Sequence, residues 1–419
     1  MAFAIANQHG IMFPKQNHGK NQGGFMPAFS RNTLIHTEHA PITRRRMLGL
    51  LGASAAMAAS AGMPAFANKD ELLPMRRGAA PLLLHFNENS LGMSPKAVEA
   101  AQNAVATKGN RYADDAINQL TSMLATKHQV PESWLVLGNG STEILNSIVN
   151  LTASKGGTLV EPTPTFGAVR GFAKAEGMPI IEVPANSDFT TNLGALKAAA
   201  DQIKGPVLIN ICNPNNPTGT ICKQAELEAW VAAAPSNQLF LIDEAYVDYA
   251  VQNPGFKSLL PLVRDGHENV VIARTFSKVY GMAGMRVGYG IAAPKTMKGL
   301  RPFTASYNLS AGGVAAAMAS LKDDAFYKRS LVSNVEAKAI LLKTLDDMRL
   351  KHIPGSTNFI LHRISGPVAD YQRRMKANGI LVGRRMTKED GWNRLSIGTP
   401  AEMRIFAKTL HAFRNEGWV

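Results

Sequence analysis

From residue 68 onward, short apolar runs alternate with segments in which apolar residues recur every three or four positions. The first pattern is typical of buried strands and the second of amphipathic helices. The runs predicted as strands are Trp134–Leu137, Thr158–Val160, Ile180–Val183, Val207–Ile211, Leu239–Ile242 and Val270–Ala273. The helical segments between them include Ser141–Leu151, Leu193–Ile203 and Gln224–Ala234. Continuous apolar strands separated by helices favour an α/β fold, with a mostly parallel sheet covered by helices on both faces.

The pattern changes after residue 308. Residues Leu309–Met348 are mostly helical, and a strand, a helix, a strand and a helix follow at Asn358–His362, Val368–Ala377, Leu395–Ile397 and Glu402–Asn415. This part predicts a smaller α+β domain. We therefore divide the chain into an N-terminal segment (1–67), an arm that joins the small domain (68–96), a large domain (97–308) and the small C-terminal domain (309–419).

The N-terminal segment has a composition of its own. Residues 1–42 are rich in Asn, Gln, Gly and His without periodicity, which predicts disorder. Three arginines, Arg44–Arg46, precede the uncharged stretch Gly49–Gly62, and Ala65-Phe66-Ala67 offers the small residues of a cleavage site. This order is typical of a twin-arginine export signal, so we expect a periplasmic mature protein without a stable membrane anchor. A retained anchor is the alternative, although the apolar stretch is short for a span. A second alternative is that the true start codon lies later than Met1.

Composition and charge exclude few function classes. Hydrophobic residues make up 45% and charged residues 18%, as is usual for a globular enzyme. The net charge of +14 favours anionic ligands, but beyond residue 67 it forms no arginine-rich run, so nucleic-acid binding is not predicted. Cys212 and Cys222 flank a turn and could pair in an oxidising compartment. Because Cys212 ends an apolar strand, a buried free thiol is the preferred interpretation.

A polar, glycine-rich loop, Thr275–Arg286, lies between two apolar runs. Its residues point to one type of cofactor more specifically than any other segment of the chain. Burial near the strands would lower the pKa of Lys278 and make its amine a usable nucleophile. The fork of Arg286 suits a fixed phosphate, and Thr275 and Ser277 add hydroxyls. A lysine nucleophile beside a phosphate clamp predicts pyridoxal 5'-phosphate (PLP), held by Lys278 as a Schiff base. The alternative is an ordinary basic loop.

Two further polar segments follow predicted strands. Gly140, Ser141 and Thr142 stand between a strand and a helix, where free backbone amides bind anions and Ser141 or Thr142 could cap the helix. The turn Asn213–Gly219 follows the predicted strand Val207–Ile211, and Asn216 in this turn could donate a hydrogen bond to a ring oxygen of the cofactor. The alternative is a tight turn, which Asn, Pro and Gly all favour.

Four more side chains could complete the site. Asp243 ends a strand at the edge of the sheet where ligands bind in such folds, and its carboxylate could hold a protonated pyridine nitrogen. Tyr246 could bond the ring oxygen together with Asn216. Phe166 could stack on the ring, with a core phenylalanine as the alternative. The fork of Arg394 suits a carboxylate, with a surface arginine at the start of a strand as the alternative.

Together these segments resemble the class I/II aminotransferases, which are PLP enzymes of fold type I, and particularly their histidinol-phosphate aminotransferase branch. The resemblance spans about residues 80–416. It rests on the motifs His85–Asn89, Asn110–Tyr112, Gly138–Ser141, Asn213–Gly219, Asp243–Tyr246, Ser277-Lys278 with Arg286, and Arg394–Gly398. It implies a PLP-dependent enzyme that moves an amino group between an amino acid and a 2-oxo acid.

The resemblance also implies a role for each residue around the cofactor. Lys278 would form the Schiff base and carry the proton from the substrate Cα. Asp243 would pair with the pyridinium, Asn216 and Tyr246 would bond the ring hydroxyl, and Phe166 would stack. The phosphate would be held by Gly140, Ser141, Thr142, Thr275, Ser277 and Arg286.

Two further implications concern the substrate and the assembly. Arg394 would bind the substrate carboxylate, close to Asn216. Tyr112 would reach the phosphate bound by a neighbouring subunit, which implies a homodimer. No metal ligand set is predicted for the chain.

Two departures from the histidinol-phosphate branch bear on the substrate. That branch usually has an arginine directly after the run Gly379–Val382, whereas here Gly383 comes first and Arg384 and Arg385 follow. Ser90-Leu91 stand where Pro and Tyr are frequent. Both departures weaken the case for a phosphorylated substrate, and export argues against a step of histidine biosynthesis, whose partners would be cytoplasmic. Decarboxylation of the threonine-phosphate decarboxylase kind and racemisation remain alternatives, while a non-enzymatic module would not need the lysine, aspartate and arginine together.

Overall fold

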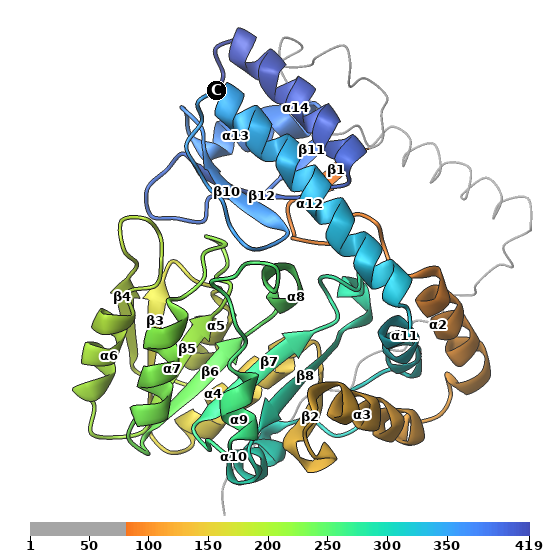
Figure 1. Ribbon diagram of the computed structural model, residues 1–419, viewed down its shortest axis with the longest axis vertical. Helices are drawn as coiled ribbons and strands as arrows, with labels where there is room; N and C mark the ends of the chain where they lie inside the picture. Colours follow the sequence, from red (N-terminus) through yellow and green to blue (C-terminus); the bar gives the residue numbers. More distant parts are fainter. Residues whose placement is uncertain (1–80) are drawn as a thin grey trace, which may run out of the picture. The chain divides into compact units, whose positions relative to one another are not determined.

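The structure, a computed structural model, describes residues 81–419 (Figure 1). The expected signal segment 1–67 and residues 68–80 of the expected arm lie outside the described residues. A seven-stranded sheet with the strand order β2-β8-β7-β6-β5-β3-β4 forms the larger layer. Its strands are β2 (Leu135–Asn139), β3 (Thr158–Thr163), β4 (Ile180–Pro184), β5 (Val207–Cys212), β6 (Gln238–Asp243), β7 (Val270–Thr275) and β8 (Val287–Ala292).

The direction of each strand follows from the length of its connection. The strands β3 to β7 pair in parallel, because helical crossovers join them. Strand β8 pairs antiparallel to both β7 and β2. Only the loop 276–286 separates β7 from β8, which is too short for the crossover that a parallel pair requires. The predicted α/β fold with a mostly parallel sheet is therefore confirmed.

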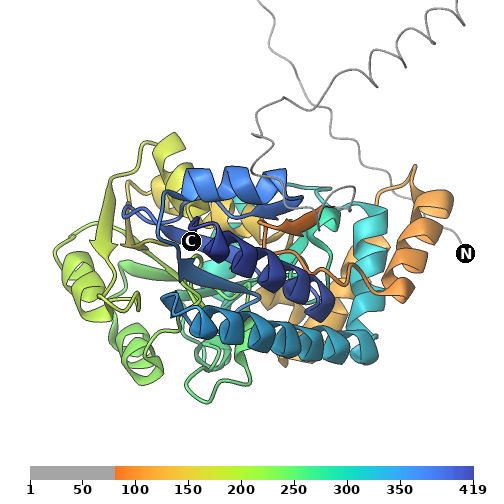
Figure 2. The same ribbon diagram turned by 90° about the horizontal axis from the view of Figure 1, so that it is seen from above.

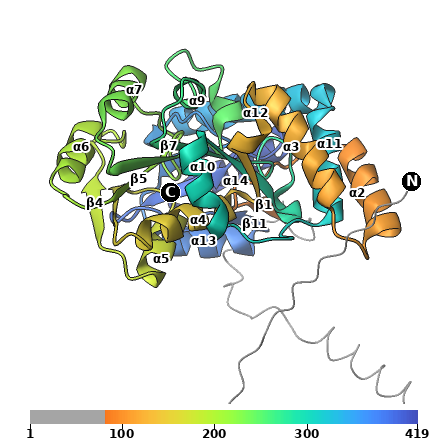
Figure 3. The same ribbon diagram turned by 90° about the horizontal axis from the view of Figure 1, so that it is seen from below.

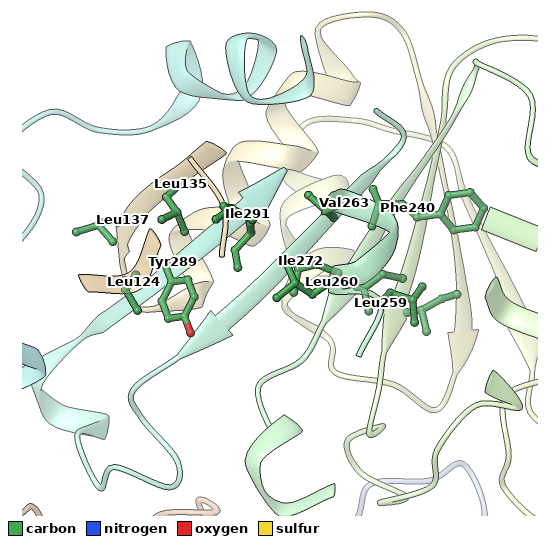
Figure 4. Packing of buried hydrophobic residues seen from close by; sticks show 14 of the residues in the cluster. Leu124, Leu135, Leu137, Phe240, Leu259, Leu260, Val263, Ile272, Tyr289 and Ile291 are labelled. Carbon is green, nitrogen blue, oxygen red and sulfur yellow. The ribbon is translucent and has the colours of Figure 1, made fainter. Parts of the chain in front are cut away.

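Helices cover both faces of this sheet, as the continuous apolar strands predicted. In β6, Leu241 packs on one face, whereas Phe240 and Ile242 pack on the other. Figure 3 shows the two helical layers, and Figure 4 shows the second face around Ile272 and Ile291. The first face is covered by α4 (Ser141–Ala153), α5 (Ala168–Ala175) and α10 (Pro294–Leu300). The second is covered by α3 (Asp114–His128), α6 (Leu193–Asp201), α7 (Gln224–Ala233), α9 (Leu260–Arg264) and α11 (Ala311–Leu321).

The C-terminal part adds two small sheets. An antiparallel sheet has the order β12-β10-β9, and a parallel pair joins β1 to β11. Helices α12 and α14 pack against each other beside these strands (Figures 1 and 2). The elements are β1 (Leu82–Leu84), α12 (Asp324–Asp347), β9 (His352–Ile353), β10 (Phe359–Arg363), α13 (Val368–Ala377), β11 (Ile380–Val382), β12 (Trp392–Ser396) and α14 (Pro400–Asn415).

Caps explain where the helices differ from the sequence prediction. The stretch predicted as mostly helical at Leu309–Met348 is divided into α11 and α12, because the side chain of Asp323 accepts the Phe326 N–H and starts a new helix. Helix α14 begins at Pro400, before the predicted Glu402, since Thr399 and Glu402 form a capping box. The remaining helices are α2 (Pro95–Lys108) and α8 (Val247–Ala250), with 3-10 turns at Glu132–Trp134, Ala283–Met285 and Arg301–Phe303.

A backbone contact joins the small antiparallel sheet to the large one. A Cβ atom added to Gly355 would lie 2.6 Å from the Cα atom of Gly219, so both positions require glycine. Ser356 N donates to Gly219 O at 2.8 Å in the same contact. Because Gly219 ends the turn that contains Asn216, the small domain holds this turn in place.

Three further observations concern the part of the chain that the structure describes. Within residues 81–419 no helix is long and apolar enough to cross a membrane. The same residues contain no group of histidine, cysteine or carboxylate side chains that could hold a metal ion. Cys212 and Cys222 are both buried free thiols, as the sequence favoured.

Candidate active site

A cavity of about 1320 Å³ opens where the parallel strands end. The last residues of β3, β5, β6 and β7 line it, which is the edge where ligands bind in open α/β sheets. Eleven of the predicted site residues meet in this cavity: Ser141, Thr142, Phe166, Asn216, Asp243, Tyr246, Thr275, Ser277, Lys278, Arg286 and Arg394. Residues far apart in the chain are therefore gathered around one space.

Hydroxyl groups and a guanidinium form one corner of the cavity. Arg286 Nη1 donates to Ser277 Oγ, and Nη2 donates to Thr142 Oγ1, both at 3.4 Å. Thr275 Oγ1 donates to Ser277 Oγ at 2.8 Å. Four groups that can donate hydrogen bonds thus converge from β7, the loop after it and α4. Such a corner can hold the oxygens of a phosphate.

The start of α4 completes this corner. The prediction that Ser141 or Thr142 caps the helix is wrong, because the N-cap is Gly140 and no side chain bonds the first turn. Gly140 has φ +71°, and a Cβ atom there would collide with the guanidinium of Arg286. The glycine therefore lets Arg286 lie against the helix start, where uncapped backbone N–H groups attract an anion.

Asp243 supplies a buried negative charge at the inner end of the cavity. Its Oδ1 atom accepts a hydrogen bond from Ala245 N at 3.1 Å, and only 4% of the residue is exposed. Burial raises the pKa of Asp243 to about 6. A buried carboxylate is costly unless a cation pairs with it. The position therefore fits a ligand ring whose nitrogen carries a proton.

A chain of hydrogen bonds connects Arg394 to Tyr246. Arg394 Nη1 donates to Asn216 Oδ1 at 2.7 Å, and Asn216 Nδ2 donates to Tyr246 Oη at 3.3 Å. Arg394 Nη2 donates to His85 O at 2.9 Å. Arg394 lies in the middle of β12 and is buried, so the alternative of a surface arginine at the start of a strand is wrong.

Lys278 reaches the centre of the cavity from the loop after β7. Its Nζ atom donates to Asn87 O at 3.2 Å and lies 5.6 Å from the centre of the Tyr246 ring. Burial, and after it the charge of Arg394, lower the pKa of Lys278 to about 8. A lysine in this state is partly neutral near pH 7, as a nucleophile and a base must be.

The two remaining aromatic residues lie at different places. Phe166 lines the cavity wall after β3 and is 38% exposed, so the alternative of a core phenylalanine is wrong. Tyr112 is 75% exposed and does not line the cavity of its own chain. It stacks on Tyr307 with 4.5 Å between the ring centres.

The segment after β1 contains site residues that sequence reasoning missed. His85 and Asn87 line the cavity, and their backbone oxygens accept hydrogen bonds from Arg394 and Lys278. The side chain of Asn87 contacts Tyr246 and Ser396. The polar run Asn87-Glu88-Asn89 after an apolar strand was the available signal, but its partners are far away in the sequence.

Comparisons with known proteins agree with this geometry. The chain matches the family "Aminotransferase class I and II" over residues 80–410. It is 35% identical to the histidinol-phosphate aminotransferase of Symbiobacterium thermophilum, over 80% of this chain and 91% of that protein. A solved structure from Erwinia carotovora atroseptica, named as a candidate histidinol-phosphate aminotransferase, has a TM-score of 0.79 and 41% identity over 81% of this chain and 97% of the other. The structure of the histidinol-phosphate aminotransferase of Sinorhizobium meliloti, solved with PLP, has a TM-score of 0.71 and 26% identity. The match covers 84% of this chain and 98% of the other.

The chain belongs to the class I and II aminotransferases. It is a PLP-dependent enzyme of fold type I that transfers an amino group between an amino acid and a 2-oxo acid. The cavity fits the cofactor, because the hydroxyl and guanidinium groups of the anion corner, the buried carboxylate of Asp243 and the amine of Lys278 line one space.

The lowered pKa of Lys278 predicts the pH dependence of cofactor capture. Because only the neutral amine attacks a carbonyl, the rate should rise about tenfold per pH unit up to pH 8 and level off above it. At pH 7 this gives roughly two hundred times more neutral amine than an ordinary lysine has. The measurement is the absorbance change after mixing cofactor-free protein with PLP between pH 6 and 10. A rate that keeps rising to pH 10 would show an ordinary lysine.

Proposed function

We propose that the substrate is an amine with an anionic group beside the reacting carbon, of the histidinol-phosphate type. The observation that carries this proposal is a pair of arginines at the cavity, Arg394 and Arg384. Burial lowers the pKa of Arg394, and the positive charge of Arg384 also lowers it. Histidinol phosphate carries a phosphate ester where an amino acid carries its carboxylate. Two guanidinium groups suit such a dianion.

Close packing explains why the second arginine stands one residue later than expected. Gly383 packs directly on the backbone of Arg394, and a Cβ atom there would collide with Arg394 O. No larger side chain fits at this position, so the arginine function moves to Arg384. Within residues 81–419, no hydrogen bond or ion pair engages the Arg384 guanidinium, which is therefore available to a substrate.

The roles proposed for the site residues follow from their positions. When bound, PLP withdraws electrons from the substrate carbon and makes its C–H bond acidic. Lys278 takes this proton on Nζ and returns it to the cofactor side, which its lowered pKa favours. Asp243 stabilises a proton on the ring nitrogen. Asn216 and Tyr246 bond the ring oxygen, and Phe166 packs on the ring face.

Substrate orientation comes from the anion sites at the two ends of the cavity. Arg394 fixes the substrate's negative group, so that the C–H bond faces Lys278. For an amino-acid substrate, this orientation favours proton removal over loss of carbon dioxide. The phosphate of the cofactor lies at the corner formed by Thr142, Ser277 and Arg286, together with Gly140, Ser141 and Thr275. Because the cofactor's phosphate and the substrate's negative group are both held, the reacting atoms have little freedom to misalign.

Replacing the second arginine tests the substrate proposal. Arg384→Gln should lower kcat/KM for histidinol phosphate roughly 10- to 100-fold, because a charged hydrogen bond is lost, and change it less for a monoanionic amino acid. Arg385→Gln is the matched control, because Thr387 O at 3.1 Å already accepts from the Arg385 side chain. Equal losses for both substrates would contradict the proposed role of Arg384.

A second substrate class is favoured by the glycine at position 383 itself. Where the histidinol-phosphate branch has an arginine, this chain has Gly383, and Ser90-Leu91 also depart from that branch. An amino acid with an unphosphorylated side chain is the substrate that these departures favour. Turnover of such amino acids without turnover of histidinol phosphate would identify this class and reject the first.

We propose that two copies of the chain form the working enzyme. The rings of Tyr112 and Tyr307 stack on each other, although the two residues are 75% and 65% exposed. Val105, which precedes Tyr112 by seven residues, is 63% exposed. In a homodimer Tyr112 reaches the phosphate of the partner. Light scattering should give the mass of two chains, and a monomer with full activity would exclude this role.

We further propose export to the periplasm through the twin-arginine signal at Arg44-Arg45, with cleavage near Ala67. Changing Arg44 and Arg45 to lysine should leave the protein in the cytoplasm. Fractionation of cells that express the wild type and the double variant tests this. Export that survives the change would point to another route.

A further inference from the structure

Asn87 is buried among the site residues. It lies between β1 and α2, only 1% of it is exposed, and its φ of +56° is a left-handed conformation that asparagine tolerates. Its backbone oxygen accepts hydrogen bonds from Lys278 Nζ at 3.2 Å and from Asn358 Nδ2 at 3.0 Å. Its side chain points to Tyr246. One residue thus contacts both the amine and the phenol of the site.

The hydrogen bonds around Asn87 fix the orientation of its amide. Asn87 N donates to Ser396 Oγ at 2.7 Å, so the Ser396 hydroxyl is free to donate to Asn87 Oδ1, 3.1 Å away. Since Oδ1 is taken by this hydroxyl, the NH₂ group is directed to Tyr246 Oη, at 3.0 Å.

The amide of Asn216 is oriented in the same way from the other side. Arg394 can only donate, so the atom it contacts at 2.7 Å must be Asn216 Oδ1. The NH₂ group of Asn216 then faces Tyr246 Oη at 3.3 Å. Two amides therefore donate to the same phenol oxygen and occupy both of its lone pairs.

With both lone pairs used, the hydroxyl proton of Tyr246 is directed away from the two amides and into the cavity. We propose that Asn87, oriented by Ser396, is a positioning residue that keeps Tyr246 a hydrogen-bond donor toward the ring oxygen of the cofactor. This inference rests on the proposed placement of Tyr246 beside that oxygen. Donation into the phenol also strengthens the bond that the phenol donates in turn.

The inference predicts a spectroscopic effect. A donor stabilises the ionised ring oxygen, so the proton of the cofactor–Lys278 linkage is lost at lower pH than without it. Asn87→Gly, which keeps the left-handed backbone, should raise the pH midpoint of the cofactor's absorbance change by roughly half to one unit. Ser396→Ala should raise it in the same direction, and Ser396→Thr should restore the wild-type value. The charged groups nearby, Asp243, Glu88, Arg286 and Arg394, are unchanged in all these variants.

The test is a pH titration of the holoenzyme's absorbance in a double-mutant cycle with Tyr246→Phe. Asn89→Ala is the control, because Asn89 contacts Val279 O and Ser330 rather than Tyr246, and it should leave the midpoint unchanged. Tyr246→Phe should raise the midpoint, and Asn87→Gly should add nothing in that background. If Tyr246→Phe has no effect, the proposed placement of Tyr246 is wrong and the inference fails with it. If Tyr246→Phe raises the midpoint but Asn87→Gly and Ser396→Ala do not, only the role of Asn87 is overturned.

Discussion

Replacing Lys278 by alanine should reduce aminotransferase activity by at least about 10⁴-fold, because the variant loses both the covalent attachment of the cofactor and the base that moves the proton. Lys278 lines the cavity, and its Nζ atom donates a hydrogen bond to Asn87 O at 3.2 Å. Borohydride reduction of the wild-type holoenzyme, followed by peptide mapping, should place the cofactor on the peptide with Lys278. In Lys278→Ala no such peptide should form.

Another lysine of the same cavity provides the control. Lys174 lines the cavity wall from α5 and is exposed. Lys174→Ala should retain the covalent cofactor and most of the activity, which excludes a general effect of removing a positive charge. Lys278→Ala should also keep the melting temperature of the cofactor-free wild type within a few degrees. A reduced cofactor peptide that persists in Lys278→Ala would assign the attachment to a different residue.

Asp243→Asn should produce the second-largest loss, roughly 150- to 5,000-fold in kcat, since a buried ion pair with the ring nitrogen is broken and such losses amount to about 3–5 kcal/mol. The substitution keeps the shape of the side chain and its acceptor for Ala245 N. It removes only the charge that stabilises a protonated ring. The cofactor should therefore remain attached to Lys278, with weaker binding, and steady-state kinetics measures the loss.

Asp248→Asn separates this effect from a general cost of changing a buried carboxylate. Burial also raises the pKa of Asp248, which accepts a hydrogen bond from Tyr327 at 2.9 Å and does not line the cavity. This variant should lose stability without a comparable loss of kcat. If Asp243→Asn retains more than about half of the wild-type kcat, the ring nitrogen needs no charged partner and the role given to Asp243 is wrong.

Most of the large sheet and the loop with Lys278 could be predicted from the sequence, because continuous apolar runs flank polar segments there. Asp243 and Thr275 end such runs, so their meeting at one edge follows from the parallel arrangement. The phosphate corner was predictable from Ser277 and Arg286 together. The position of Gly140 as the N-cap was not, because three consecutive small residues can each occupy that place.

The contribution of the segment after β1 could not be predicted. Asn87 lies 159 residues from Tyr246 and 309 from Ser396 in the sequence. The pairing of β1 with β11 places the segment that carries Asn87, and each of these strands has three residues, which is too short to show a periodic pattern. The packing of Gly383 on Arg394 depends on the same small sheets. The position of Arg384 at the cavity therefore could not be predicted from the sequence either.

The most direct test of aminotransferase chemistry at this site is a single half-reaction. Holoenzyme is mixed with histidinol phosphate and with a panel of amino acids in the absence of any 2-oxo acid, and the products are counted per subunit. We expect one equivalent of the oxo product for the true amino donor, with a change in the cofactor's absorbance that a 2-oxo acid reverses. Release of carbon dioxide, or loss of the substrate's optical activity with no oxo product, would contradict this expectation and assign the cavity to decarboxylation or racemisation.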